Sequence, residues 1–137
     1  MNTPTHRHRT TIRVVFALFT IAQLTATHWP GLSIQSKVFS RIDLIIHASV
    51  FFVWTVLFYN ARVYNARIVG LGDRSQTPCF KRRIIWTIVV GMLFAIFDET
   101  TQPLFNRVAD PLDAMADTLG VLLAAASIAL CAKRRRA

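Results

Sequence analysis

The sequence has little charge for its length, and this scarcity bears directly on the fold class. Of the 137 residues, 17% are charged, against roughly 25% in an average soluble domain, while 53% are hydrophobic. Two stretches, Ile84–Phe97 and Thr118–Ala132, contain no charged residue. A soluble helical bundle would carry charges at regular helical intervals on its outer faces. The composition therefore favours a membrane protein over a soluble bundle.

Cysteine is also scarce, and internal repeats and low-complexity segments are absent from the sequence. The two cysteines, Cys79 and Cys131, lack the spacing of a zinc site or of a redox motif, and no disulfide is expected. The length is that of one domain. The sequence therefore argues against a disulfide framework and against a repeat array.

Apolar residues gather in four blocks, each close to the roughly 20 residues that a membrane-spanning helix needs. We predict an all-α protein, an integral membrane four-helix bundle, with spans at about residues 14–29, 42–60, 84–102 and 113–132. The uncharged run of the third span has only 14 residues, which rise about 21 Å and cannot cross roughly 30 Å of hydrocarbon. The third and fourth spans must therefore extend through Asp98, Glu99 and Asp117. These carboxylates are expected inside the outer boundary of the membrane.

The basic residues lie on one side of the predicted spans and account for the net charge of +9. Of the 16 basic residues, 13 fall in the first tail, in the loop between the second and third spans, and in the last tail. Only Lys37, Arg41 and Arg107 fall on the other side. This bias predicts that residues 1–13 and 133–137 are basic tails in the cytoplasm. It also indicates contacts with anionic membrane lipids and argues against nucleic-acid binding.

The first span carries a polar face of its own. Thr20, Gln23 and Thr27 share one helical face, which we expect to look into the bundle. Residues 1–11 before this span are polar and basic, and we expect a frayed tail there. Residues 60–83 contain glycine, serine and proline, and are predicted to be a long cytoplasmic loop.

Three predicted spans bring ionisable groups to one depth near the outer side of the membrane. The group consists of Asp43 and His47 on the second span, Asp98, Glu99 and Gln102 on the third, Asp113 and Asp117 on the fourth, and Arg107 in the turn between the last two. A charged side chain inside a span costs a few kcal/mol, so such groups pair with each other or serve a function. Arg107 is the obvious counter-charge, and its planar guanidinium can bridge two carboxylates. A protonated His47 could supply a second positive charge.

Small residues occupy the same helical faces as these carboxylates. Gly91 and Ala95 fall on the face of Asp98, and Gly120 falls on the face of Asp117. Small residues let helix backbones approach closely within a membrane. We therefore predict close packing of the third and fourth spans against their neighbours at these positions.

Four roles are compatible with the polar cluster. It could be structural and hold the helices in register. It could bind a polar headgroup at the outer leaflet, with Arg107 contacting a phosphate or a carboxylate. It could perform acid–base chemistry, with His47 and Glu99 as proton carriers. It could also hold a divalent metal through His47, Glu99 and Asp113.

In order and spacing, these residues resemble the VanZ-like family. The matching pattern is Asp43-x-x-x-His47-x-x-x-Phe51 on the second span, Glu99-x-x-Gln102 at the end of the third, and Arg107-x5-Asp113-x3-Asp117-x2-Gly120 into the fourth. Three positions depart from the family pattern: Leu44 replaces a lysine, Asp117 an asparagine and Ala124 a second glycine. The cluster should therefore be more acidic here than in typical members.

The resemblance implies a small bacterial protein of the cytoplasmic membrane, with a four-helix domain over residues 14–132. The founding member of the family is linked to low-level resistance to the glycopeptide teicoplanin, and no reaction is implied. Our leading hypothesis is a protein that binds or modulates an amphiphilic cell-envelope ligand, such as a lipid-linked cell-wall precursor or a lipoglycopeptide antibiotic. The alternatives are a membrane enzyme that uses His47 and Glu99 on a lipid-linked substrate, and a purely structural network. No cofactor and no metal are expected, and the sequence does not define an oligomeric state.

Overall fold

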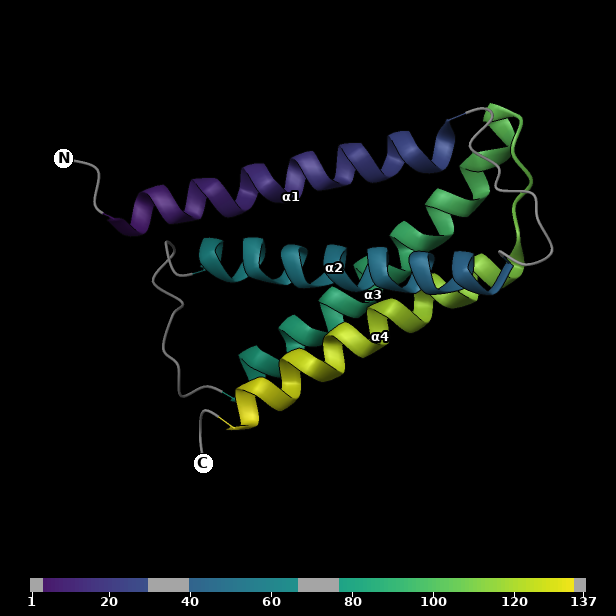
Figure 1. The fold of residues 1–137 in the computed structure, drawn as a ribbon. Coiled ribbons are helices and arrows are strands. Elements are labelled where there is room, and N and C mark those ends of the chain that lie inside the picture. Colours follow the sequence, from purple (N-terminus) through teal and green to yellow (C-terminus); the bar gives the residue numbers. More distant parts are fainter. Residues whose placement is uncertain (1–3, 30–39, 67–76, 135–137) are drawn as a thin grey trace.

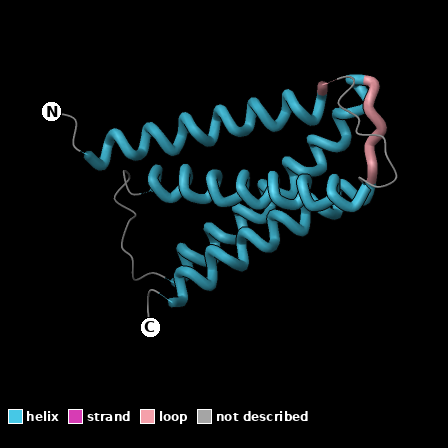
Figure 2. Tube along the Cα trace, viewed as in Figure 1, coloured by secondary structure: helices cyan, strands magenta, loops and turns pink. Residues whose placement is uncertain are grey.

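The computed structural model describes residues 4–29, 40–66 and 77–134. This part of the chain consists of α1 (Pro4–His28), α2 (Ser40–Ala66), α3 (Thr77–Thr101), the short 3₁₀ helix η1 (Gln102–Phe105) and α4 (Pro111–Arg134) (Figure 1). No strand occurs within these ranges (Figure 2). The prediction of an all-α protein is therefore confirmed.

Successive helices run in opposite directions along the bundle. The start of α1 and the end of α4 consequently lie at one end, and η1 with the turn that follows it lies at the other (Figure 1). Most of the described basic residues near the helix ends lie at the first of these ends, for example Arg62, Arg83 and Lys133, whereas Arg41 lies in the first turn of α2 at the other. The carboxylates of α2, α3 and α4 gather at the opposite end. The bundle is thus polarised along its axis.

All four helices are long and apolar enough to cross a membrane, with mean hydropathy between 1.4 and 1.9. The candidate spans are Thr10–His28, Ile42–Arg62, Phe80–Phe105 and Pro111–Arg134. The third includes Asp98 and Glu99, and the fourth includes Asp117, as the length argument required. The chain is therefore a multi-pass membrane protein, and five of its seven acidic residues lie within the candidate spans.

Helices extend further at the basic end than the sequence predicted. The expected frayed tail is wrong from Pro4 onward, where α1 begins with a proline, a residue favoured in the first helical turn. Residues 60–83 were predicted to be a loop, yet α2 runs to Ala66 and α3 begins at Thr77. The segment between Asn60 and Ala66 contains neither glycine nor proline, and so nothing in it interrupts the helix. The remainder of that loop, residues 67–76, lies outside the described residues.

Small residues allow the close helix packing that the sequence predicted. A methyl group added to Gly120 would overlap the backbone carbonyl oxygen of Ala48 on α2. A methyl group on Gly91 of α3 would lie 2.9 Å from Cγ1 of Val121 on α4. Ala95 is buried in the core beside Val121. The three predicted packing positions therefore sit at helix contacts.

An aromatic cluster in the middle of the bundle joins α1, α2 and α3. The ring of Trp54 stacks on Phe58 and on Phe94, with centroid distances of 5.2 and 4.5 Å. Its indole Nε1 donates a hydrogen bond to Oγ1 of Thr20 at 3.0 Å. Thr20 thus faces the interior, as predicted for its side of α1. The contact between Trp54 and Thr20 therefore sets which face of α1 points into the bundle.

Candidate functional site

His47 is the point at which α2 and α4 meet within the polar cluster. Its Nδ1 atom lies 3.0 Å from Oδ1 of Asp117, within hydrogen-bond distance. Its Nε2 atom lies 3.7 Å from Oδ2 of Asp113, one turn earlier on α4. Asp43, one turn before His47 on α2, belongs to the same group, since side-chain ligand atoms of Asp43, His47 and Asp113 lie within 4.8 Å of one another. The close approach at Gly120 brings these two helices into contact.

The carboxylate of Glu99 is held from two directions at the end of α3. Its Oε1 accepts a hydrogen bond from the Gln102 side-chain amide at 2.7 Å, and its Oε2 accepts one from the backbone N–H of Asp110 at 3.3 Å. Gln102 is the first residue of η1, which keeps it one turn away from Glu99. Both side chains are buried. The predicted Glu99–Gln102 pair therefore exists and anchors the turn that leads to α4.

Asp98 faces α1 instead of α4. Its Oδ1 accepts a hydrogen bond from Oγ1 of Thr27 at 2.9 Å, and Nδ1 of His28 lies 3.7 Å from the same oxygen. The other ring nitrogen of His28 is 2.8 Å from Oγ1 of Thr101. Sequence reasoning did not include His28 among the site residues. The available signal was a histidine at the end of the first span, beside the polar face that contains Thr27.

The bridge between two carboxylates that Arg107 could form is absent from the described part of the chain. The ion pairs found there all use a histidine, and Arg107 donates its hydrogen bond from a guanidinium nitrogen to the backbone oxygen of Ala26 at 3.4 Å. The reason lies in the turn before it. Asn106 adopts the left-handed conformation, with φ of 59°, and closes η1. The chain direction after this residue carries the Arg107 side chain towards the end of α1.

A cavity of about 190 Å³, with a mostly apolar wall that carries several polar side chains, lies between α1 and α2 under Arg107. Its lining consists of Gln23, Ala26 and Thr27 from α1, Asp43, Ile46, His47, Val50 and Phe51 from α2, and Arg107. Gln23 is only 5% exposed, yet neither atom of its side-chain amide has a hydrogen-bond partner among the described residues. Buried polar groups in native structures nearly always have a partner, whether protein, water or ligand. The cavity is therefore the place where Gln23 can find one.

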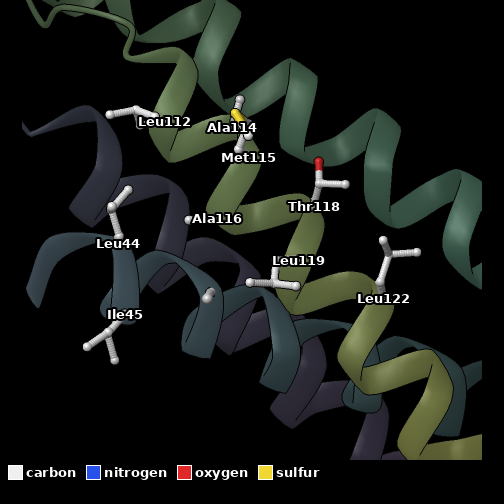
Figure 3. Close-up of a pocket in the computed structure, with 10 residues that line it drawn as sticks. Leu44, Ile45, Leu112, Ala114, Met115, Ala116, Thr118, Leu119 and Leu122 are labelled. Carbon is white, nitrogen blue, oxygen red and sulfur yellow. The ribbon is translucent and has the colours of Figure 1, made fainter. Parts of the chain in front are cut away.

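A second concavity, of about 750 Å³, is an open apolar groove between α2 and α4 on the other side of α2 (Figure 3). It is lined by Leu44, Ile45, Ala48, Leu112, Ala114, Met115, Ala116, Thr118, Leu119 and Leu122. Thr118 supplies the sole side-chain polar atom of this lining. When the helices span a membrane, such a surface contacts the acyl chains of lipids.

The balance of charge at this end of the bundle is strongly negative. Among the side chains that the structure describes at this end, six carboxylates accompany one permanent cation, Arg107, and two histidines, His28 and His47. The six are Asp43, Asp98, Glu99, Asp110, Asp113 and Asp117. Two of these carboxylates, Asp98 and Asp117, are fully buried, and each has one oxygen without a hydrogen-bond partner among the described residues. Burying an uncompensated charge is expensive, so these groups require protons or a further cation. The arrangement can thus bind an anion at Arg107, carry protons at His47 and Glu99, or hold a cation between carboxylates.

Fold and site together define a small multi-pass membrane protein with a buried acidic and histidine cluster at one end of four helices. The chain belongs to the VanZ/LLP1 family, whose family model matches residues 2–132. The resemblance read from the residues between Asp43 and Gly120 is therefore confirmed and extends over nearly the whole chain. Comparisons with curated proteins and with solved structures gave no match.

Proposed function

We propose that this VanZ/LLP1-family protein binds the polar headgroup of an amphiphilic cell-envelope molecule. The molecule would be a lipid-linked cell-wall precursor or a lipoglycopeptide antibiotic at the outer leaflet of the bacterial cytoplasmic membrane. The observation that carries the proposal is the cavity in which the buried amide of Gln23 has no partner and Arg107 has no carboxylate partner among the described residues.

The cavity has the chemistry that a headgroup requires. Arg107 offers guanidinium donors that suit a phosphate or carboxylate, and Gln23 adds both a donor and an acceptor. Asp43 and His47 on the opposite wall can accept or donate hydrogen bonds to hydroxyl or amide groups. The volume of about 190 Å³ far exceeds the roughly 10–15 Å³ that one water needs. A phosphate-sized group therefore fits.

The proposal includes an orientation in the membrane. Both termini are in the cytoplasm, and the cavity opens towards the outer leaflet. The support is the positive-inside bias, because most of the described basic residues lie away from the cavity, with Arg41 and Arg107 as the exceptions. A headgroup could then reach Arg107 from the outside while its chain remains in the bilayer.

A binding measurement tests the proposal with two probes, teicoplanin and a polyprenyl diphosphate, added to the protein in lipid nanodiscs. We expect saturable binding of at least one probe, which Arg107→Ala and Gln23→Leu each weaken by about tenfold or more. Arg82→Ala is the matched control, because Arg82 is exposed at the opposite end of the bundle. Binding of neither probe, or an equal loss in Arg82→Ala, contradicts the proposal.

One observation supports the enzyme alternative. His47 borders the cavity while Asp117 holds its Nδ1 atom, and an orienting carboxylate of this kind accompanies many catalytic histidines. In that case a bound lipid-linked probe is chemically converted, and Glu99→Gln abolishes conversion while binding persists. An unchanged probe after prolonged incubation favours the binding function.

A further inference from the structure

We infer that His47, Glu99 and Asp117 form a binding site for a divalent transition-metal ion. One ligand atom from each residue lies within 4.8 Å of the others, and the three come from α2, α3 and α4. The inference goes beyond the proposed function, because it concerns the buried centre of the cluster, which shares only His47 with the cavity under Arg107. It also revises the sequence-based expectation that no metal is bound.

The donor set fits this class of ion. One imidazole nitrogen with two carboxylates suits Zn²⁺ or Mn²⁺, and three protein ligands leave a coordination position open. Two ligands of a tetrahedral Zn²⁺ ion lie about 3.3 Å apart, given bond lengths of about 2.0–2.1 Å. The 3.0 Å between Nδ1 of His47 and Oδ1 of Asp117 is close to that spacing. Small side-chain rotations would complete the geometry.

An independent observation at Asp117 points to a missing ligand. The side chain is 0% exposed, and its Oδ2 atom has no hydrogen-bond partner among the described residues. A buried carboxylate oxygen without a partner costs free energy, and a cation bound by both Oδ1 and Oδ2 of Asp117 removes that cost. Two carboxylates and a neutral imidazole around a divalent ion are electrically neutral. Arg107 does not supply this charge, since it contacts the carbonyl of Ala26.

The surrounding residues resemble the supporting shell of a metal site. A metal-bound histidine usually directs its other ring nitrogen at a carboxylate, and Nε2 of His47 lies 3.7 Å from Asp113. Ligating carboxylates are usually fixed by hydrogen bonds, and Glu99 accepts one from Gln102 and one from the backbone of Asp110. Both ligands are thus oriented by groups outside the set.

A second group, Asp43, His47 and Asp113, also has metal-ligand spacing. Its members are only partly buried, and none of them has a fully buried atom without a partner within the described ranges. We therefore assign the ion to the inner group, with Asp113 as the partner of the second imidazole nitrogen.

The test uses the purified full chain in detergent, stripped with chelator, with no histidine tag and with His6 and His8 replaced by alanine in every variant. Calorimetric titration with Zn²⁺ is expected to show one saturable site per chain. Asp117→Asn and Glu99→Gln should each weaken binding by roughly tenfold or more. Asp98→Asn is the matched control, because Asp98 is equally buried and lies outside the set.

A second measurement uses Co²⁺ and the wild-type protein alone. Its outcome therefore does not depend on whether the variants fold. We expect a visible absorption band on addition of Co²⁺, and an X-ray absorption spectrum with a nitrogen/oxygen first shell and the outer-shell scattering of one imidazole ring. Absence of saturable Zn²⁺ binding overturns the inference. So does an equal loss in Asp98→Asn, or loss in Asp43→Asn with binding retained in Asp117→Asn. Arg107→Ala should bind Zn²⁺ as the wild type does, which separates this site from the headgroup cavity.

Discussion

His47 and Asp117 are 70 positions apart in the chain, yet Nδ1 of one lies 3.0 Å from Oδ1 of the other. This contact joins α2 to α4 at the buried end of the cluster, one turn before the close approach of Gly120 to Ala48. Without the other, either residue would be a buried polar group that lacks this hydrogen-bond partner. The two side chains therefore act as a unit, which a double-mutant cycle can measure.

His47→Phe should lower the free energy of unfolding by about 3–5 kcal/mol, because it leaves the Asp117 carboxylate buried without its partner. The double variant His47→Phe/Asp117→Leu should lose less than the sum of the two single variants, by about 1–3 kcal/mol. Equilibrium unfolding in mixed detergent micelles measures all four proteins. Trp86→Phe combined with Asp117→Leu should be additive, since Trp86 is exposed and outside the cluster. Additivity in the His47 cycle would contradict the coupling.

Gly120→Ala should destabilise the bundle by about 1–3 kcal/mol, the usual range for overpacking. The added methyl group meets the backbone oxygen of Ala48, which cannot move without separating α2 from α4. Gly91→Ala should cost less, because the obstacle is a side chain, that of Val121. Melting temperatures in detergent rank the two variants. The reverse order would show that the α2–α4 contact is looser than described.

Thr27→Val should destabilise the protein by about 1–3 kcal/mol, because the buried carboxylate of Asp98 loses a hydrogen-bond donor. Thr25→Val is the control from the same helix. Its hydroxyl is exposed and bonds only to the carbonyl of Ile21, so the change should stay within about 0.5 kcal/mol. Thermal unfolding compares the pair. Equal effects would mean that the Thr27–Asp98 bond contributes nothing.

Thr20→Val tests how α1 is attached to the middle of the bundle. The substitution keeps the shape of the side chain but removes the acceptor for the indole N–H of Trp54, at an expected cost of about 1–3 kcal/mol. Trp54→Phe should cost at least as much, because it also shortens the stack between Phe58 and Phe94. Tryptophan fluorescence during unfolding is unsuitable for Trp54→Phe, so circular dichroism is used for both. If Thr20→Val leaves the free energy of unfolding unchanged, the hydrogen bond between Trp54 and Thr20 does not contribute to the attachment of α1.

Labelling of single cysteines tests the proposed orientation. In a chain with Cys79 and Cys131 changed to serine, Phe105→Cys should react with a membrane-impermeant maleimide added to intact cells. Arg134→Cys should react only after the cells are opened. Phe105 is exposed next to the turn after α3, and Arg134 is exposed at the other end of the bundle. The opposite labelling pattern would reverse the topology and move the cavity to the cytoplasmic side.

Much of the fold could be predicted from local patterns in the sequence. The uncharged run Ile84–Phe97 marks a span, and its shortness forces Asp98 and Glu99 into the membrane-crossing helix. The spacing of Gly91 and Ala95 indicated the packed face of α3, because helical periodicity depends only on positions along one chain. Features of this kind require no knowledge of the neighbouring helices.

The choice of partners within the cluster could not be predicted in the same way. Asp98 and Asp117 have the same chemistry and the same expected depth, but Asp98 contacts Thr27 on α1 while Asp117 contacts His47 on α2. That choice depends on the rotation of each helix, which the packing at Gly120 and the aromatic cluster at Trp54 determine. The contact of Arg107 with Ala26 has a similar origin. A single left-handed residue, Asn106, redirects the chain, and charge alone does not reveal it.

The bond between Glu99 and Asp110 has a consequence for sequence variation. Its donor is the backbone N–H of residue 110, not a side chain. Any residue except proline presents that N–H, so the carboxylate stays anchored through almost every substitution at this position. The side chain of Asp110 has a separate task, since its Oδ1 accepts the N–H of Leu112 at the start of α4. The turn can therefore vary in composition while Glu99 keeps this hydrogen bond, and Asp110→Pro would remove it and leave Glu99 with the hydrogen bond from Gln102.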